Sequence, residues 1–199
     1  MDRMTQYTEF YVIDRNGEGR FHVYNRRTNE ELLTDREIYD AQEIEFKAGE
    51  RWLNARYFVG EVGGDRYRRD VFINISLGKT LEDINDPSEA FDHFYFQRAE
   101  THNVFFEAIG DPEGGMDYYV LDSRAERRMG PYRLYGALGD GYLGLKKNRE
   151  WVLWKDFEEL CEPMPHKKFE WYLRLKRIPG VEDFLHATVD PFEDLFTAF

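Results

Sequence analysis

Cysteine is almost absent from this sequence, since Cys161 is the only one in 199 residues. A single thiol cannot form a disulfide within the chain, so the fold must be held by its core, which a chain of this length can supply. No apolar stretch approaches the roughly 18 residues needed to span a membrane, and the opening residues, MDRMTQYTEF, contain no apolar run typical of a signal peptide. We therefore expect a cytoplasmic protein that does not engage a membrane.

Positive charge is outnumbered, because 27 Lys and Arg stand against 39 Asp and Glu, which gives a net charge of −12. Residues 1–123 carry 14 Lys and Arg against 26 Asp and Glu, residues 124–177 carry 13 against 8, and residues 178–199 carry none against 5. Each contact with a nucleic-acid phosphate requires a cation, so direct nucleic-acid binding is disfavoured. The acidity favours either solubility alone or a protein partner with a basic surface, such as a nucleic-acid-binding protein.

A complete phosphate-binding loop is missing. Gly78-Lys79-Thr80 follows a strand-like run, but Ile73 stands where the first glycine of such a loop is required. Without that glycine the backbone amides cannot wrap a phosphate, so we interpret the segment as a turn that enters a helix.

Metal-ligand spacing is missing as well. The densest group of candidate ligands contains His93 and His102, which are nine residues apart and therefore face opposite ways on a helix or a strand. Cys161 and His166 could form a thiolate–imidazole pair, but a lone cysteine on an apolar helix face is typical of a core residue. We predict no metal, no cofactor and no catalytic residue.

Aromatic residues are abundant, at 17% of the chain, and several flank hairpin signals. Apolar runs lie on both sides of Asn16-Gly17 and of Gly63-Gly64-Asp65, which are turn-forming clusters. Further strands are predicted at 117–121 and 151–154, and at 169–176, where a helix with Phe169, Tyr172 and Leu173 inward is the alternative. This spacing favours antiparallel pairing over alternation of strands with long helices.

The stretch from Tyr132 to Trp154 contains a formal dinucleotide-binding fingerprint, Gly139-Asp140-Gly141-Tyr142-Leu143-Gly144. That motif requires a strand that turns into an apolar-striped helix within a parallel fold, and the residues that follow do not fit this context. Asp140-Gly141 between aromatic arms instead predicts a hairpin. Gly136 and Gly144 then mark the close approach of a core ring, such as Trp151 or Trp154, or of a ligand.

Short helices are predicted at 35–41, where Thr34-Asp35-Arg36-Glu37 fits a capping box, and at 87–109, 155–162 and 181–198. The expected fold class is α+β, an antiparallel sheet built from hairpins with short covering or flanking helices. We expect a single domain over 1–199; if there are two subdomains, 1–110 and 116–199, they meet near 110–116.

Three functions remain open. The first is an acidic, non-enzymatic interaction module that binds or inhibits a basic partner, of which a nucleic-acid mimic is a special case. The predicted contact residues are an acidic run and the stripe of an acidic, Phe-rich segment: Glu30, Glu31, Asp35, Glu37, Asp40, Glu43, Phe192, Leu195, Phe196 and Phe199. The second is a small-ligand or nucleotide binder, or an enzyme, whose pocket lies near Gly139–Gly144 and uses His93, His102, Arg128, Gly139, Asp140 and Gly141. The third is a structural or assembly subunit.

Overall fold

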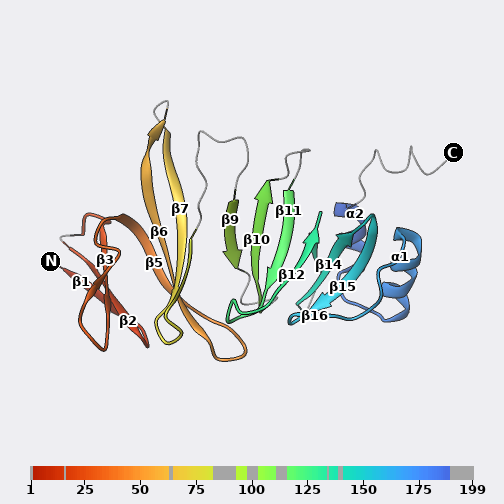
Figure 1. Ribbon diagram of the computed structural model, residues 1–199, viewed down its shortest axis with the longest axis horizontal. Helices are drawn as coiled ribbons and strands as arrows, with labels where there is room; N and C mark the ends of the chain where they lie inside the picture. Colours follow the sequence, from red (N-terminus) through yellow and green to blue (C-terminus); the bar gives the residue numbers. More distant parts are fainter. Residues whose placement is uncertain are drawn as a thin grey trace.

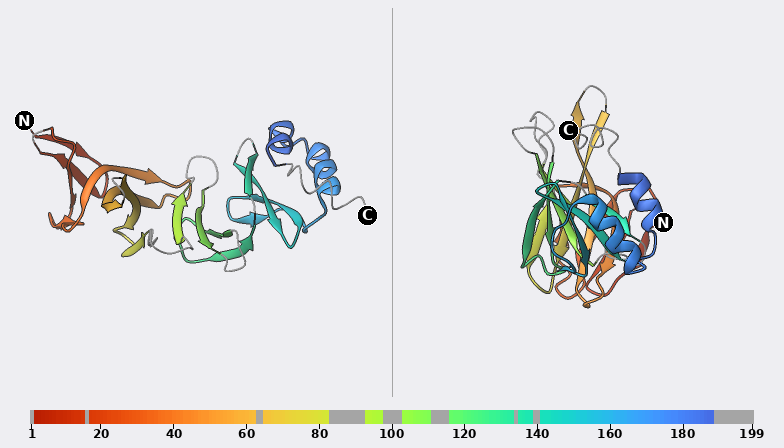
Figure 2. Two further views of the ribbon diagram at one scale, coloured as in Figure 1. Left: turned by 90° about the horizontal axis from the view of Figure 1, so that it is seen from above. Right: turned by 90° about the vertical axis from the view of Figure 1, so that its right-hand side faces the viewer.

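Three antiparallel sheets follow one another in chain order along the long axis of the molecule, and two helices lie at the far end (Figure 1). The same succession is visible from above in the left-hand view of Figure 2. The computed structural model describes residues 2–15, 17–62, 65–82, 93–97, 103–110, 116–133, 135–138 and 141–188. The fold is therefore mostly antiparallel β, with helices that flank one end, so hairpin-built sheets are confirmed while the helical share is smaller than predicted.

Sheet A, the first sheet, pairs its strands in the order β1-β2-β3-β5-β6-β7-β8, with β4 on β3. Its strands are β1 (Arg3–Gln6), β2 (Phe10–Asp14), β3 (Phe21–Asn25), β4 (Glu31–Leu32), β5 (Glu37–Glu45), β6 (Arg51–Val62), β7 (Asp65–Asn74) and β8 (Lys79–Glu82). A core of side chains that includes Phe10, Val23 and Leu53 lies within this sheet. The two hairpins predicted here are confirmed: Val12 pairs with Val23, and Val62 pairs with Asp65.

Sheet B has the order β12-β11-β10-β9, and sheet C the order β13-β14-β15-β16. Their strands are β9 (His93–Gln97), β10 (Phe105–Gly110), β11 (Met116–Leu121), β12 (Arg128–Tyr132), β13 (Tyr135–Leu138), β14 (Tyr142–Lys147), β15 (Glu150–Lys155) and β16 (Glu158–Glu159). Two helices complete the described chain: α1 (His166–Leu175) and α2 (Val181–Thr188). The strands predicted at 117–121 and 151–154 are confirmed as parts of β11 and β15.

Strand β10 of sheet B is buried on both faces, which explains why the predicted helix over 87–109 is wrong wherever that range is described. Phe105 and Phe106 are adjacent in β10 and therefore point to opposite faces. Phe105 packs with Trp52 and Phe72 of sheet A, whereas Phe106 belongs to a cluster with Trp154 of sheet C. A strand buried on both sides carries a continuous apolar run, which resembles a buried helix in periodicity.

The predicted helix over 35–41 is also wrong, because Glu37–Glu45 forms β5 and pairs with β6 along its whole length. Only a turn precedes it, with the Arg36 amide donating to the Leu33 carbonyl at 3.1 Å. A capping box is a local signal worth about 1 kcal/mol, which an eight-pair ladder to a long neighbouring strand outweighs. Likewise, Gly78 lies in a turn as predicted, but the turn enters β8 instead of a helix.

Around 155–162 the helix prediction fails because β15 runs to Lys155 and a tight turn then returns the chain as β16. Asp156 and Phe157 both have positive φ, at 46° and 68°, which no α-helix contains. Leu160 N–H donates to the Leu153 carbonyl at 2.7 Å, so the segment is held against β15.

The strand predicted at 169–176 is wrong, and the alternative helix is correct. α1 buries Phe169 and Leu173 completely and Tyr172 partly, which is the inward set that the helical alternative named. Of the helix predicted at 181–198, α2 confirms the first part, and the remainder lies outside the described residues. The division near 110–116 stays a prediction; β10 and β11, which flank 111–115, pair with each other.

Candidate interaction surface

The glycine-rich stretch forms the hairpin β13–β14, in which Gly136 pairs with Gly144 and Leu138 with Tyr142. A strand, not a helix, follows the glycines, so the predicted hairpin is confirmed. Phe184 of α2 approaches Gly144: a Cβ atom added to Gly144 would lie 2.3 Å from Cζ of that ring. The close approach predicted at Gly144 is thus made by a core ring, although not by the two tryptophans named as candidates.

Most residues of the alternative ligand site cannot be placed together. His102, Gly139 and Asp140 lie outside the described residues, and of His93 only the backbone, in β9, is described. Arg128 lies in β12, where its Nε atom is 2.6 Å from the carboxylate of the buried Glu107. Its guanidinium also stacks 3.6 Å from the centre of the Tyr119 ring. Arg128 is thus an exposed residue of sheet B that pairs with a buried carboxylate, while Gly141 is a buried turn residue of sheet C.

Most of the predicted acidic contact residues of sheet A lie close to an arginine, or in one case to a histidine, of the same region. The pairs are Glu31 with His22 (2.6 Å), Asp35 with Arg36 (3.7 Å), Glu37 with Arg20 (3.8 Å), Asp40 with Arg56 (3.4 Å) and Glu43 with Arg51 (3.3 Å). Glu30 is exposed beside them. A basic partner would have to compete with these arginines, which lessens the charge that this region offers.

Negative charge is concentrated instead between residues 83 and 123, which carry one Lys or Arg against ten Asp or Glu. Three of the ten, Glu107, Asp117 and Asp122, pair with arginines of the 127–133 segment. The other seven lie outside the described residues. The Phe192, Leu195, Phe196 and Phe199 stripe also lies outside them.

Cys161 is a packing residue. Burial raises the pKa of its thiol, and its Sγ atom accepts a hydrogen bond from the Leu153 amide at 3.4 Å. The ring of His166 lies against Trp151, with its centre 6.2 Å away, and its Nε2 atom has no hydrogen-bond partner among the described residues. The raised pKa, which burial causes in spite of the hydrogen bond from Leu153, favours a neutral thiol over a thiolate.

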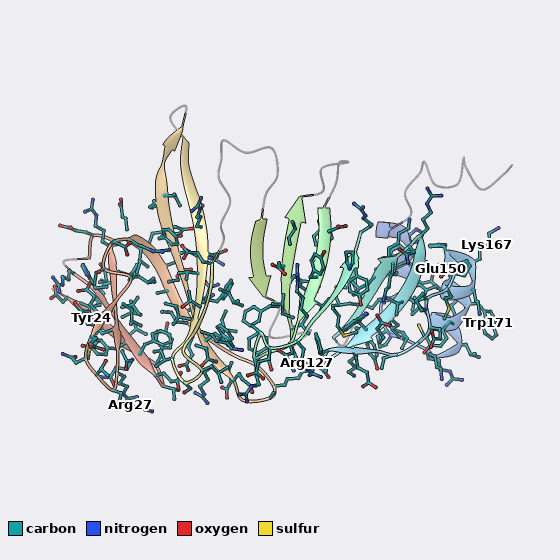
Figure 3. All side chains as sticks on the ribbon, viewed as in Figure 1. Tyr24, Arg27, Arg127, Glu150, Lys167 and Trp171 are labelled. Carbon is teal, nitrogen blue, oxygen red and sulfur yellow. The ribbon has the colours of Figure 1, made fainter. Side chains whose placement is uncertain are left out.

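The most conspicuous surface is the outward side of α1, which the strand prediction had concealed. Trp171 is 62% exposed and Leu175, one turn later, is 59% exposed, whereas Phe169 and Leu173 on the opposite side are fully buried. Figure 3 shows Trp171 and Lys167 directed away from the rest of the molecule at this end. We call this set the α1 outer face; it comprises Lys167, Lys168, Trp171, Arg174 and Leu175.

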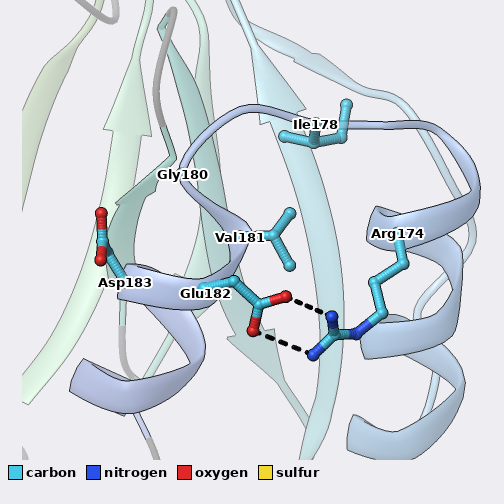
Figure 4. Close-up of a pocket in the computed structure, with 6 residues that line it drawn as sticks. All are labelled: Arg174, Ile178, Gly180, Val181, Glu182 and Asp183. Atoms are coloured by element: carbon cyan, nitrogen blue, oxygen red, sulfur yellow. Dashed lines mark hydrogen bonds and ion pairs between the residues drawn. The ribbon is translucent and has the colours of Figure 1, made fainter.

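Beside this face, α1 and α2 are joined by Arg174, whose guanidinium binds both carboxylate oxygens of Glu182 (Figure 4). Arg174 also donates to Glu170 on its own helix at 3.0 Å. An open, solvent-exposed pocket of about 550 Å³ lies between the two helices. Its lining residues are Arg174, Ile178, Gly180, Val181, Glu182 and Asp183. Arg174 is therefore neutralised, while Lys167 and Lys168 form no ion pair with any described residue.

Among the described residues there is no group of three or more His, Cys, Asp and Glu side chains able to hold a metal ion. In that same part of the chain, no helix has both the length and the apolar character needed to cross a membrane. No family model, no curated protein and no solved structure matches this chain.

Proposed function

We propose that this protein is a protein–protein interaction module that works by surface contact. The observation that carries the proposal is the exposed Trp171–Leu175 pair on a helix whose other side is well packed. Tryptophan is among the residues that contribute most binding energy at interfaces, and neighbouring apolar residues exclude water around it. Trp171 and Leu175 together form an apolar patch beside Lys167, Lys168 and Arg174, and apolar patches rimmed by polar residues are typical of contact sites.

A basic partner, as the net charge suggests, remains part of the proposal. The acidic stretch 83–123 supports it better than the carboxylates of sheet A do, because the latter already hold arginines. Long-range attraction to the acidic stretch would steer the encounter with a basic partner, whereas the α1 outer face, which itself carries Lys167 and Lys168, would supply only the short-range apolar contact of Trp171 and Leu175. The small-ligand alternative gains no support from Gly144, since Phe184 occupies the space above it.

The test is quantitative affinity capture from the host with three immobilised chains: the wild type, Trp171→Ser with Leu175→Ser, and a matched control, Met4→Ser with Val59→Ser. The control also replaces two exposed apolar side chains, 57% and 42% exposed, but in sheet A. We expect a protein that the wild type and the control retain and that the α1 variant loses by at least about tenfold, equivalent to about 1.4 kcal/mol.

Capture is repeated at about 50 and about 300 mM salt, because screening weakens contacts between exposed charges. A partner that is steered by the acidic stretch should be retained less at the higher concentration. Identical retention by all three chains would contradict the assignment of the contact to α1, and retention independent of salt would contradict the basic partner.

A further inference from the structure

We propose that the α1 outer face binds the 189–199 segment of the same chain, VDPFEDLFTAF, which follows α2 directly. This inference rests on the proposed function, because it names an occupant of the same surface. It would make the segment a competitor of the partner.

Charge on the two elements is complementary. Lys167 and Lys168 are exposed and unpaired among the described residues, and Lys176 and Arg177, just after α1, are exposed too. The 189–199 segment contains three carboxylates, Asp190, Glu193 and Asp194, and no cation. The two lysines also occupy the first turn of α1, where the helix dipole favours anions and no side chain caps the helix. An acidic segment bound there would neutralise the charge of the two lysines. It would also place carboxylates beside the positive end of the helix dipole.

Apolar groups on the two elements also correspond. The α1 outer face offers Trp171 and Leu175 at a spacing of one helical turn. The segment offers four large apolar side chains at helical spacing, Phe192, Leu195, Phe196 and Phe199. An acidic segment with an apolar stripe matches a basic face with an apolar centre, which is the pattern of peptide recognition on a helix or in a groove.

The segment is long enough to reach the face. α1 and α2 lie side by side, joined by the Arg174–Glu182 ion pair (Figure 4). Eleven residues follow Thr188; the first three can extend by about 10 Å at about 3.3 Å per residue, and the eight that carry the apolar stripe are about 12 Å long as a helix. α1 has ten residues and is about 15 Å long. A segment that starts at the end of α2 can therefore lie along most of α1 while its apolar stripe is helical.

The tryptophans of this chain allow a direct test. Trp52, Trp151 and Trp154 are at most 1% exposed, so quenching of tryptophan fluorescence by neutral acrylamide reports on Trp171. We expect that ending the chain after Thr188 raises the quenching constant severalfold, because Trp171 becomes uncovered. Replacing Lys167 and Lys168 by Glu in the full chain should have the same effect. Adding Asp190→Lys, Glu193→Lys and Asp194→Lys to that variant should restore the protection.

Each other outcome overturns the proposal. Equal quenching of the full and shortened chains shows that the segment does not cover Trp171. Protection that rises with protein concentration assigns the face to the segment of a second copy, and protection that appears only with added anionic vesicles assigns it to a lipid surface. None of these results affects capture of a partner through Trp171 and Leu175, so failure of this inference is distinguishable from failure of the proposed function.

Discussion

At the residue scale, Gly144 shows how the absence of a side chain positions a helix. Its neighbours in β14 and β15 are large and buried, and the ring of Phe184 enters the space that any other residue would fill. Phe184 then contacts Trp151 edge-on at 5.4 Å and lies near Phe169 of α1. Because Gly144 has no side chain, Phe184 can pack against sheet C and against α1 at the same time. This packing positions α1 and therefore its outer face.

We expect Gly144→Ala to lower the free energy of unfolding by about 1–3 kcal/mol, because the added methyl group overpacks the site. Phe184→Ala should cost about 3–5 kcal/mol by leaving a cavity. In the double variant the alanine methyl partly fills that cavity, so denaturant titration should show a loss smaller than the sum of the single losses. Strictly additive losses would contradict the contact.

A second residue-scale feature is the half-buried cluster of Arg36, Tyr57 and Glu82 in sheet A. Arg36 and Tyr57 both donate to the Glu82 carboxylate, and the guanidinium lies 4.5 Å from the centre of the tyrosine ring. Burial by itself raises the pKa of Glu82, but the hydrogen bonds from Arg36 and Tyr57 outweigh it and lower that pKa below its ordinary 4.5. Burial and Glu82 together raise the pKa of Tyr57 to about 12.

Because the pKa of Glu82 is lower in the folded state, its stabilising contribution is full above pH 4.5 and is lost as pH falls through the folded-state value. Glu82→Gln should therefore cost about 1–3 kcal/mol of unfolding free energy at neutral pH. The difference from the wild type should shrink below pH 4.5. Urea titrations across this range provide the measurement, and a difference independent of pH would show that the ionised carboxylate contributes nothing.

At the element scale, the hairpins were predictable while β5, β10 and α1 were not. Turn residues such as Asn16-Gly17 act locally, through backbone conformations that few other residues adopt, so short sequence windows identify them. β10 is buried between two sheets, and its largely apolar residues, interrupted only by Glu107, have no period that separates strand from helix. Whether such a segment forms a strand or a helix depends on packing partners that are distant in the sequence.

α1 was mispredicted for a reason that bears on function. Trp171 and Leu175 are apolar but point outward, so with Phe169 and Leu173 they produce a false alternation of period two. An apolar residue on the wrong side of a helix breaks the amphipathic pattern, and such local conflicts concentrate at functional sites. The α1 outer face could therefore not be predicted from the amphipathic pattern, because Trp171 and Leu175 depart from that pattern.

The two sides of α1 should respond differently to substitution. Phe169→Ala removes a fully buried ring, and we expect it to cost about 3–5 kcal/mol of unfolding free energy. Trp171→Ser, on the exposed side, should change the unfolding free energy by no more than about 0.5 kcal/mol. Thermal and chemical unfolding of both variants provide the comparison. A large loss in Trp171→Ser would make that side chain part of the core and remove the main argument for an interaction surface.

At the scale of the whole molecule, the layers place the two ends far apart: β1 lies at one end and α1 at the other (Figure 1). Trp52, Phe105 and their neighbours join sheet A to sheet B, Phe106 and Trp154 join sheet B to sheet C, and Phe184 joins sheet C to the helices. Contacts between successive layers therefore run along the whole axis. The α1 outer face is the terminal surface of this series, where no further layer of the described chain covers it.

The most direct test of the central claim is photo-cross-linking in the host from a benzoylphenylalanine placed at position 171, with position 4 as the control site. Both residues are more than half exposed and lie on opposite ends of the molecule. We predict an adduct with a second protein from position 171 but not from position 4, with a higher yield when residues 189–199 are removed. The absence of any position-specific adduct from 171, in both the full and the shortened chain, would contradict the account.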